Sequence, residues 1–344
     1  MPKHSPPYKG GNCPALISIL IINRIITNRD GKMYALEVKN LSKTFGALKA
    51  VDNASFTVPE GAIFGLIGRN GAGKTTTIRM MMNIYLPDSG EVLLRGVKVG
   101  QEFKNNVGYL PEERGLYKKM KVLETLLYFA EIKGKTGKAI EKKAVEYLKR
   151  FDLYDRKLTK VEELSKGNQQ KIQFIATILH DPEFIILDEP FSGLDPINTN
   201  LLREIIIEKK REGKVIILST HLMDFAEKMC DHLAMIDHGK VILQGQLSEI
   251  KAKYSQRNIT ITHEGDLSFL YGNQMIEKIS DFGNATGVRV REEKNTQELL
   301  KLLIDKGITI KKFDANDISL QDIFIELAGR DDDSVLNKGV SDVK

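Results

Sequence analysis

Cysteine is nearly absent from this chain, since Cys13 and Cys230 are the only two among its 344 residues. One of them lies in an atypical N-terminal segment, so a disulfide framework is excluded and a reducing compartment is expected. Long apolar runs are scarce as well. The run ALISILII at 15–22 is shorter than the roughly 20 residues that a membrane-spanning helix needs. Lysines precede it, as they precede the core of a signal peptide, but no small-residue cleavage site follows.

Most of the chain has no marked excess of positive or negative charge. Of the net charge of +5, residues 1–32 carry +4, which leaves +1 for residues 33–344. A basic surface for nucleic acid is therefore not expected from the composition. Because the composition changes abruptly at Met33, we expect residues 1–32 to be an atypical leader. It would be disordered or foreign to a native protein that begins at Met33.

From Met33 onward, short apolar runs alternate with helical patterns. Continuous apolar runs predict buried strands of a parallel sheet, and apolar residues spaced three and four apart predict helices between them. This alternation predicts an α/β core with a parallel sheet. The predicted elements are strands at 34–45, 53–58, 62–68, 184–189 and 214–220, helices at 118–134, 137–153, 167–180 and 196–213, and a hairpin at 232–245.

The pattern changes after Gln256. Residues 257–329 combine short β-branched runs with two helical patterns, which predicts a small α+β accessory module behind the core at 33–251. The remaining residues, 330–344, are polar, and we expect them to form a flexible tail.

A glycine-rich loop stands between a predicted buried strand and a predicted helix. Its sequence, GRNGAGKT at 68–75, fits the phosphate-loop pattern G-x-x-x-x-G-K-[ST] in the required setting. The glycines let backbone N–H groups point at a phosphate, and the helix N-terminus adds positive potential. In this pattern Lys74 reaches the β- and γ-phosphates and Thr75 reaches Mg²⁺. A chance glycine-rich turn is the alternative, which the strand–loop–helix setting disfavours.

Two acids end the predicted strand FIILDE at 184–189. Buried carboxylates are costly unless they meet a cation or a polar site. Asp188 is therefore predicted to hold the metal through water, and Glu189 to polarise the water that attacks the phosphate. The alternative is a strand that simply exits into solvent. Beside a phosphate loop, the catalytic interpretation is favoured, and the chain is predicted to be a nucleotide triphosphatase.

Four further stretches resemble the conserved motifs of ATP-binding-cassette (ABC) ATPases, in the same order along the chain. LSKGNQQK at 164–171 resembles the signature, SGLD at 192–195 the D-loop, STH at 219–221 the H-loop and KTFG at 43–46 the aromatic A-loop. The resemblance covers about residues 33–251. The C-terminal module is similar to the extra domain of a bacterial exporter-type subgroup, which includes sodium-extrusion and self-protection ATPases.

The resemblance implies a P-loop NTPase (RecA-like) core with an antiparallel β subdomain and a helical subdomain at about 112–165. It also implies an ATPase whose site is divided between two cassettes. Ser165 and the N–H of Gly167 would contact the γ-phosphate of the partner's ATP, Asp195 would follow the dimer seam, and Phe45 would stack on adenine. Lys74, Glu189 and His221 would be catalytic, with His221 helping to fix the attacking water. The remaining nucleotide contacts would come from Gly68, Asn70, Gly71, Ala72, Gly73, Thr75 and Thr76.

The chain departs from the family's usual pattern in two places. In the signature, Lys166 and Asn168 replace the third and fifth residues of LSGGQ, while Ser165 and Gly167 are retained. In the loop GYLPEERGLY at 108–117, Glu112 stands where the family usually has a glutamine that reaches the metal. A carboxylate there could ligate Mg²⁺ directly, which makes Thr75, Asp188 and Glu112 the expected metal residues. The alternative is a solvated turn at PEER.

These observations predict the ATPase subunit of a transporter, most simply an exporter, on the cytoplasmic face of the membrane. The implied cofactors are ATP and Mg²⁺. The implied partners are a membrane-spanning permease on another chain and a second cassette, which is either the same chain or a paralogue. A non-transport cassette acting on nucleic acid or ribosomes is the alternative, but such proteins usually carry two cassettes or a coiled-coil insertion. A regulatory binder without turnover is disfavoured by the intact catalytic set. The cargo is not encoded in recognisable residues.

Overall fold

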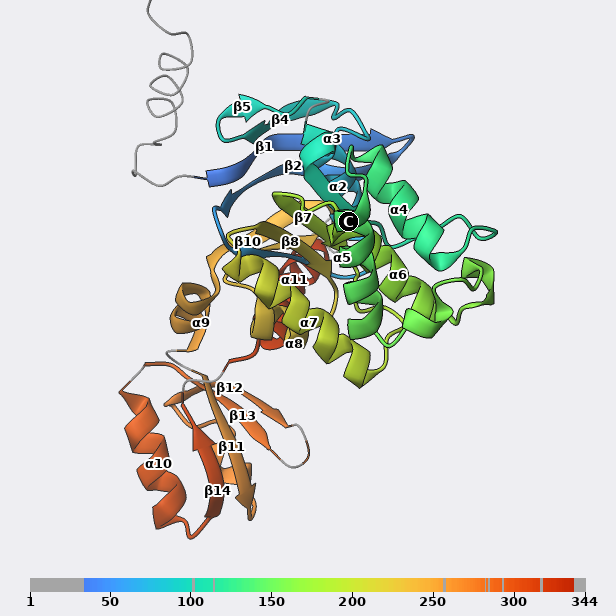
Figure 1. The fold of residues 1–344 in the computed structure, drawn as a ribbon. Coiled ribbons are helices and arrows are strands. Elements are labelled where there is room, and N and C mark those ends of the chain that lie inside the picture. Colours follow the sequence, from blue (N-terminus) through green and yellow to red (C-terminus); the bar gives the residue numbers. More distant parts are fainter. Residues whose placement is uncertain are drawn as a thin grey trace, which may run out of the picture.

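The computed structural model describes residues 34–336, apart from 101–102, 114, 256–257, 282, 284, 293 and 316–317. The predicted leader 1–32 and Arg114 of the PEER stretch lie outside the described residues. The chain forms a large unit with a smaller one beneath it (Figure 1). Within the described ranges, no helix has both the length and the apolar character needed to cross a bilayer.

A six-stranded sheet lies at the centre of the large unit, in the order β10-β9-β3-β8-β7-β6. Its strands run parallel from β9 to β6, and β10 pairs antiparallel with β9. The apolar runs predicted to be buried strands are confirmed, since every residue of β3, β7 and β8 is buried. The bounds are β3 Ile63–Ile67, β6 Val107–Leu110, β7 Phe184–Asp188, β8 Val215–Thr220, β9 His232–Asp237 and β10 Lys240–Gln246.

Helices flank this sheet and extend to one side as a helical subdomain (Figure 1). In that subdomain α4, α5 and α6 pack on one another through Leu126, Leu148, Phe151 and Phe174, all fully buried or nearly so. The helices of the large unit are α2 Lys74–Met81, α3 Phe103–Asn106, α4 Val122–Ile132, α5 Lys138–Arg150, α6 Lys166–Leu179, α7 Pro196–Arg211, α8 Met223–Met229 and α9 Leu247–Ser255. Short 3-10 turns cover Tyr154–Arg156 and Val161–Glu163.

An antiparallel sheet covers the end of the large unit that faces away from the smaller unit (Figure 1). Its strand order is β2-β1-β4-β5. Its inner face shares one apolar cluster with the central sheet. Phe56 of β2 stacks on Phe64 of β3, with ring centroids 5.4 Å apart, so the two sheets are held at van der Waals distance. The strands are β1 Tyr34–Phe45, β2 Leu48–Pro59, β4 Ser89–Leu94 and β5 Val97–Lys98.

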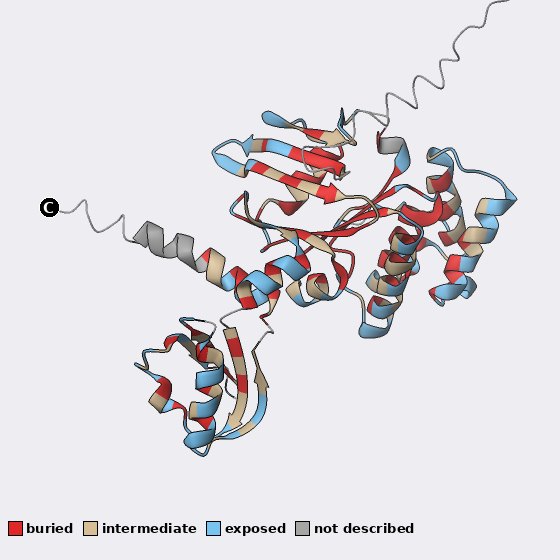
Figure 2. Cartoon of the chain, turned by 90° about the vertical axis from the view of Figure 1, so that its left-hand side faces the viewer, coloured by how far each residue is buried: buried red, intermediate tan, exposed pale blue. Residues whose placement is uncertain are grey.

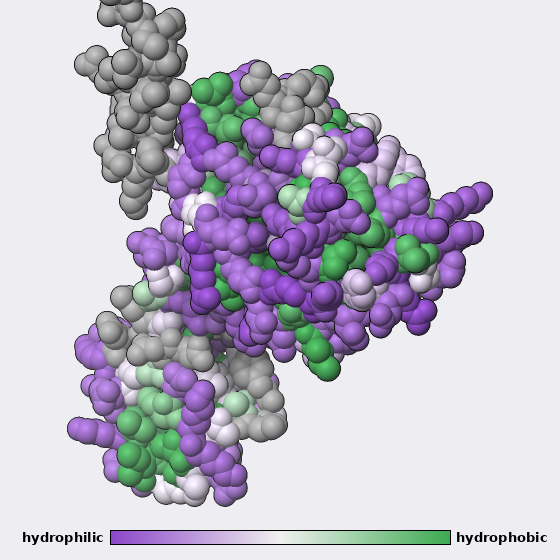
Figure 3. All heavy atoms as spheres, viewed as in Figure 1, coloured by the Kyte–Doolittle hydropathy of each residue, from purple (hydrophilic) through white to green (hydrophobic). Residues whose placement is uncertain are grey.

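The smaller unit is an antiparallel sheet with one helix on one face. Its strand order is β12-β13-β11-β14, and α10 packs its buried Leu299 and Leu303 against that sheet. On the face shown in Figure 3, hydrophobic atoms gather over α10. The elements are β11 Asn258–Glu264, β12 Ile276–Asp281, β13 Thr286–Val290, α10 Asn295–Asp305 and β14 Thr309–Asp314, with a 3-10 turn at Ser268–Leu270.

The last helix, α11 at Leu320–Leu336, returns to the large unit. Ile318, Leu320, Ile323 and Phe324 are buried in the same apolar cluster as the helical subdomain and α8. The sequence pattern assigned this helix to the accessory module at 257–329, but its apolar face packs on the cassette instead. The helix also continues to Leu336, so the first part of the expected tail at 330–344 is helical, and residues after 336 lie outside the described part.

His180 follows the last residue of α6 and is only 5% exposed. Burial lowers the pKa of His180 to about 4, and the neighbouring Lys133 adds to this shift. The imidazole therefore stays neutral in the folded protein, while the unfolded chain takes up a proton near pH 6.5. The free energy of unfolding should fall by on the order of 1–3 kcal/mol as the pH drops from about 6.5 to about 4. Urea unfolding of His180→Gln and of the unchanged protein at pH 7 and pH 4.5 measures how much of this loss in unfolding free energy His180 causes.

The variant is expected to lose less stability between the two pH values than the unchanged protein. His238→Gln is the matched control, because the side chain of His238 is 82% exposed. An equal acid loss in His180→Gln and the unchanged protein would show that His180 is not the group responsible.

Candidate nucleotide site

The phosphate loop connects the end of β3 to the start of α2, as the sequence predicts. Gly73 has a φ of 106°, and a Cβ there would lie 2.4 Å from the carbonyl oxygen of Ala50. At Gly68 a Cβ would lie 2.1 Å from the carbonyl oxygen of Ile236, so a side chain is excluded by contact with β9. Both positions therefore need glycine. Between them stand Arg69, Asn70, Gly71 and Ala72, and α2 begins at Lys74, which Thr75 and Thr76 follow.

Lys74 is buried inside the curve of this loop. Its Nζ donates hydrogen bonds to the carbonyl oxygens of Gly68 at 2.8 Å and Arg69 at 3.0 Å, and it lies 3.6 Å from Oε1 of Glu189. Burial lowers the pKa of Lys74, and the carboxylates of Glu189 and Asp188 oppose that shift. The ammonium is thus pre-placed at the mouth of the loop by carbonyl dipoles and two acids.

Glu189 stands just beyond the end of β7, at the carboxyl edge of the sheet. Its Oε1 accepts a hydrogen bond from the backbone N–H of His221 at 2.9 Å and lies 2.9 Å from Nδ1 of the same residue. Thr220 donates its hydroxyl to Oε2 at 3.3 Å. The backbone of Glu189 has a φ of 48°, a left-handed conformation that is uncommon for a residue other than glycine. The predicted base and the predicted histidine are therefore in direct contact.

Asp188 is the last residue of β7 and has no exposed surface. Among the described residues, neither of its carboxylate oxygens finds a hydrogen-bond partner. Burial raises the pKa of Asp188, and the hydroxyls of Ser219 and Thr75 oppose that shift. Orphaned buried carboxylate oxygens beside a hydroxyl are hard donors, so the residues present fit Mg²⁺. No group of three or more His, Cys, Asp or Glu side chains in the described ranges could hold a metal. Phosphate and water would have to complete its shell.

The loop with Glu112 follows β6, which lies beside β7 in the sheet. Gln173 of α6 donates from Nε2 to the carbonyl oxygens of Pro111 and Glu113, each at 3.2 Å, and so fixes the backbone on both sides of Glu112. The Glu112 side chain is exposed, and its charge acts on Lys74 to raise the pKa of that ammonium. The structure thus brings Glu112 to the same edge of the sheet as the predicted metal residues.

The signature residues lie against the backbone of the loop between β7 and α7, which contains the D-loop. A Cβ on Gly167 would lie 3.2 Å from the carbonyl oxygen of Gly193, and Gln170 donates to the carbonyl oxygen of Pro190 at 3.2 Å. Ser165 caps α6 by accepting the N–H of Asn168 at 3.3 Å. These contacts join the start of α6 to the loop between β7 and α7, so the two motifs form one surface.

Asp195 caps α7, accepting the N–H groups of Ile197 and Asn198 at 3.0 Å each. These hydrogen bonds lower the pKa of Asp195. In the part of the chain that the structure describes, Ser165 and Asp195 make no hydrogen bond to Lys74, Asp188 or Glu189. The predicted site residues therefore fall into two groups, one around Lys74 and one on the surface formed by the signature and the D-loop. Lys166 is exposed at the start of α6.

Phe45 ends β1 and is 43% exposed. Its ring meets the edge of Tyr85, with centroids 5.6 Å apart, and Tyr85 accepts a hydrogen bond from Arg79 at 3.2 Å. Arg79 also pairs with Glu113 at 3.5 Å. The sequence did not indicate Tyr85 or Arg79. Their only signal was their place just after the phosphate loop, on and beyond α2.

The fold and these contacts define a P-loop nucleotide triphosphatase with a helical subdomain and a signature surface. Residues 51–192 match the family model described as ABC transporter, and residues 245–328 match that of the ATP-binding protein DrrA1-3-like C-terminal domain. The chain belongs to the ATP-binding proteins of ABC transporters. It is the ATP-binding and ATP-hydrolysing subunit of such a transporter.

The matches cover nearly the whole length of the relatives. It is 45% identical over 294 residues to the uncharacterized ABC transporter ATP-binding protein YhaQ of Bacillus subtilis, covering 86% of this chain and 98% of the relative. It is 31% identical to the Nod factor export ATP-binding protein I of Cupriavidus metallidurans, over 86% of this chain and 98% of that one. A solved structure of the ATP-binding subunit of an ABC transporter superimposes with a TM-score of 0.59 at 33% identity, covering 64% of this chain and 93% of that one.

Proposed function

We propose that this subunit drives export, from the cytoplasmic face of the membrane, through a membrane-spanning permease on another chain. The direction rests on similarity to a relative named for Nod factor export. ATP hydrolysis is supported by one cluster of side chains, in which Oε1 of Glu189 lies 3.6 Å from Nζ of Lys74 and 2.9 Å from Nδ1 of His221. In it a base, a phosphate-binding cation and a group that orients the base converge on the mouth of the phosphate loop.

Hydrolysis would use this cluster as follows. The loop N–H groups and Lys74 hold the β- and γ-phosphates and stabilise the charge that develops on the transferred phosphoryl group. The attacking water gives its proton to Glu189, which the backbone N–H and ring of His221 keep oriented. Phe45 receives the adenine ring on its exposed face. Glu189 is released from Lys74 when the γ-phosphate draws the ammonium toward itself.

Mg²⁺ would be held by Thr75 and Asp188, with Glu112 as a third oxygen ligand. A bound Mg²⁺ neutralises phosphate charge and polarises the γ-phosphoryl group. Asp188 suits this role because both of its buried oxygens lack a partner among the described residues. Glu112 suits it because Gln173 fixes its loop at the sheet edge. A carboxylate here adds negative charge that only a cation can balance.

ATP closure of two cassettes would complete the site. Ser165 and Asp195 are exposed on the surface formed by the signature and the D-loop, and among the described residues neither makes a hydrogen bond to the Lys74 cluster of its own chain. Ser165, with the N–H of Gly167, would therefore meet the γ-phosphate of the partner's ATP, and Asp195 would follow the dimer seam. The N-terminus of α6 at Ser165 favours that anion. Binding then selects the closed pair, and hydrolysis reopens it.

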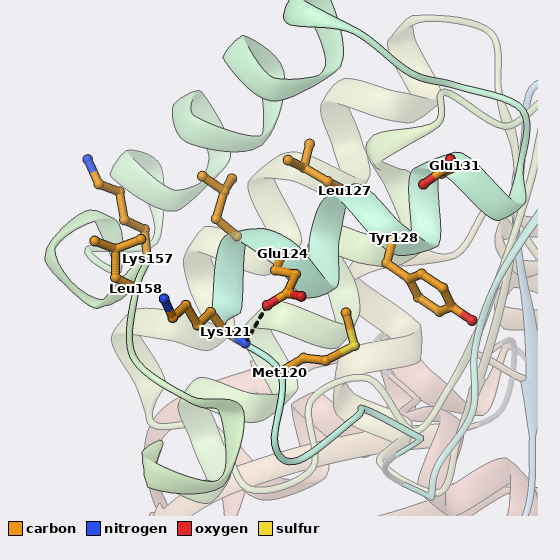
Figure 4. A pocket seen from close by; sticks show the side chains of 9 residues that line it. Met120, Lys121, Glu124, Leu127, Tyr128, Glu131, Lys157 and Leu158 are labelled. Carbon is orange, nitrogen blue, oxygen red and sulfur yellow. Dashed lines mark hydrogen bonds between the residues drawn. The ribbon is translucent and has the colours of Figure 1, made fainter.

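A groove in the helical subdomain would receive a short helix of the permease (Figure 4). It has a volume of about 460 Å³ and lies along α4. Leu123, Leu127 and the exposed Leu158 give it apolar surface, and charged side chains line it beside them. This combination suits an amphipathic helix. The lining residues are Met120, Lys121, Leu123, Glu124, Leu127, Tyr128, Glu131, Lys157 and Leu158.

Glu189→Gln should lower ATP turnover by about 10²–10⁴-fold, the usual contribution of a general base, while ATP binding is retained. With ATP, the same variant should run as a dimer on size exclusion, because closure is no longer followed by hydrolysis. Lys74→Ala is the contrast, since it should weaken ATP binding itself. A near-normal rate in Glu189→Gln would refute Glu189 as the base, and a strict monomer with ATP would refute the divided site.

Glu112→Gln should make ATP hydrolysis less steeply dependent on Mg²⁺. The glutamate places a negative charge at the site that opposes ATP until the cation arrives, whereas glutamine is neutral. The measurement is turnover across a Mg²⁺ titration at fixed ATP, with Glu113→Gln as a matched control one residue away. Superimposable curves for Glu112→Gln and the unchanged chain would remove Glu112 from the metal site.

Leu158→Asp should abolish attachment to the permease and leave the ATPase rate of the isolated chain within about two-fold. Leu158 is 64% exposed, so a carboxylate there disturbs the groove and not the core. Val97→Asp on β5, equally exposed at 67%, is the control. The measurement is the amount of full-length chain retained on washed native membranes, with the attached chain identified by mass spectrometry. Equal retention of both variants would place the permease elsewhere.

A further inference from the structure

Helix α11 lies between the cassette and the accessory module. In Figure 2 the helix that leads to the C-terminus runs along the boundary between the two units. Its start is fixed to the cassette, because the backbone N–H of Leu320 donates to Oε2 of Glu227 on α8 at 2.9 Å. Lys251 of α9 pairs with the other oxygen of Glu227. Two cassette helices, α8 and α9, therefore meet the start of α11 at one carboxylate.

One side of α11 reaches the phosphate loop. Phe324 is 3% exposed, and the guanidinium of Arg69 lies over its ring, 5.1 Å from the centroid. Arg69 is the second residue of the loop, and its carbonyl oxygen accepts hydrogen bonds from Nζ of Lys74 at 3.0 Å and from the N–H of Ala72 at 3.2 Å. The residue whose backbone shapes the cradle of Lys74 is thus held through its side chain by the C-terminal helix.

The other side of α11 reaches the accessory sheet. Glu326 pairs with Arg289 of β13 at 2.7 Å, and both side chains are only 16% exposed. Residues two apart on a helix do not share a face. Phe324 and Glu326 therefore point to different neighbours, which are the phosphate loop and the module. An ion pair this sheltered is screened less by solvent than a surface pair and holds the geometry more firmly.

We propose that Phe324 is a positioning residue for ATP binding, and that the accessory module adjusts this function through the Arg289–Glu326 pair. Phe324 holds the guanidinium of Arg69, which keeps the Arg69 carbonyl, and with it Lys74 and the loop N–H groups, in the arrangement that receives phosphate. Displacement of the module would pull on α11 and loosen this hold. The proposal rests on the role given above to Lys74 and the loop, and it adds to that role a regulatory input from the C-terminal region.

The first test compares substitutions on α11 in the full chain. Phe324→Leu keeps a buried apolar side chain but removes the ring, and Phe324→Tyr keeps the ring. Ile323→Val is the matched control, because Ile323 is fully buried one residue away. The measurements are Kd for ATP, KM and kcat of hydrolysis, and the thermal midpoint of each variant. A cation–π contact of ordinary strength corresponds to about two- to ten-fold in affinity.

Phe324→Leu should raise Kd and KM for ATP by about two- to ten-fold with little change in kcat, and Phe324→Tyr should restore both. Arg69→Met should give the same shift. The double variant with Phe324→Leu should be no worse than either single change, because both remove one contact. An unchanged KM, or a shift that Ile323→Val reproduces in proportion to its thermal midpoint, would overturn the proposal and leave Phe324 as a core residue.

The second test addresses the module. Arg289→Gln should raise KM for ATP in the same direction, and it should have no further effect once Phe324→Leu is present. Arg291→Gln is the control beside the same sheet, since Arg291 is the residue after β13 and its side chain is exposed. An Arg289→Gln shift that adds fully to Phe324→Leu would overturn the coupling. Lys74→Ala distinguishes failure of the nucleotide site from failure of the proposed role of α11, because normal ATP binding in that variant would refute the site itself.

Discussion

The burial of one ammonium group organises the nucleotide site. Lys74 has little contact with water, yet it carries a charge, so its surroundings must replace the lost hydration. Two loop carbonyls and the carboxylate of Glu189 supply that replacement. The loop has to curve to present those carbonyls, which is why Gly68 and Gly73 tolerate no side chain. The conformation that cradles the lysine is also the one that directs backbone N–H groups toward a phosphate.

The parallel sheet brings the remaining groups to this point. Strands β6, β7, β3 and β8 all run in one direction, so the residues that follow them meet at a single edge. Glu112, Asp188, Glu189 and His221 come from three different strand ends. Helix α6 then links this edge to the signature surface, because Gln173 holds the Glu112 loop while Gln170 holds the loop after β7. A rotation of the helical subdomain would therefore move the Glu112 loop and the loop after β7 together.

The last helix, α11, packs on the cassette although it follows the accessory module in the sequence. After β14 it leaves the accessory sheet and buries Leu320, Ile323 and Phe324 in the apolar cluster of the large unit. The accessory module is thus inserted between two parts of the cassette and is attached at both ends. This topology gives the module a direct route to the phosphate loop, which a domain joined by a single linker would lack.

Several elements could be predicted because their signals are local. The buried runs at β3, β7 and β8 have no other stable place than a covered parallel sheet, and the phosphate-loop pattern prescribes a strand before it and a helix after it. Lys74, Asp188, Glu189 and His221 follow from such patterns. The short helix α8 and strand β12 show no comparable periodicity, since a few residues carry too little pattern to separate helix, strand and loop. The contact between Tyr85 and Phe45 joins residues far apart in the sequence, so no local pattern predicts it.

The sequence by itself determined the fold class, the phosphate loop and the family, because each depends on neighbouring residues or on motifs in a set order. The tertiary structure alone decided which residues support them. Arg69 and Phe324 are separated by most of the chain, and Glu227 and Leu320 by 93 residues, and nothing in their local sequence indicates a contact. Such pairs form only when α11 returns to the cassette. It returns because its apolar face is buried there and has no comparable partner among its neighbours in the sequence.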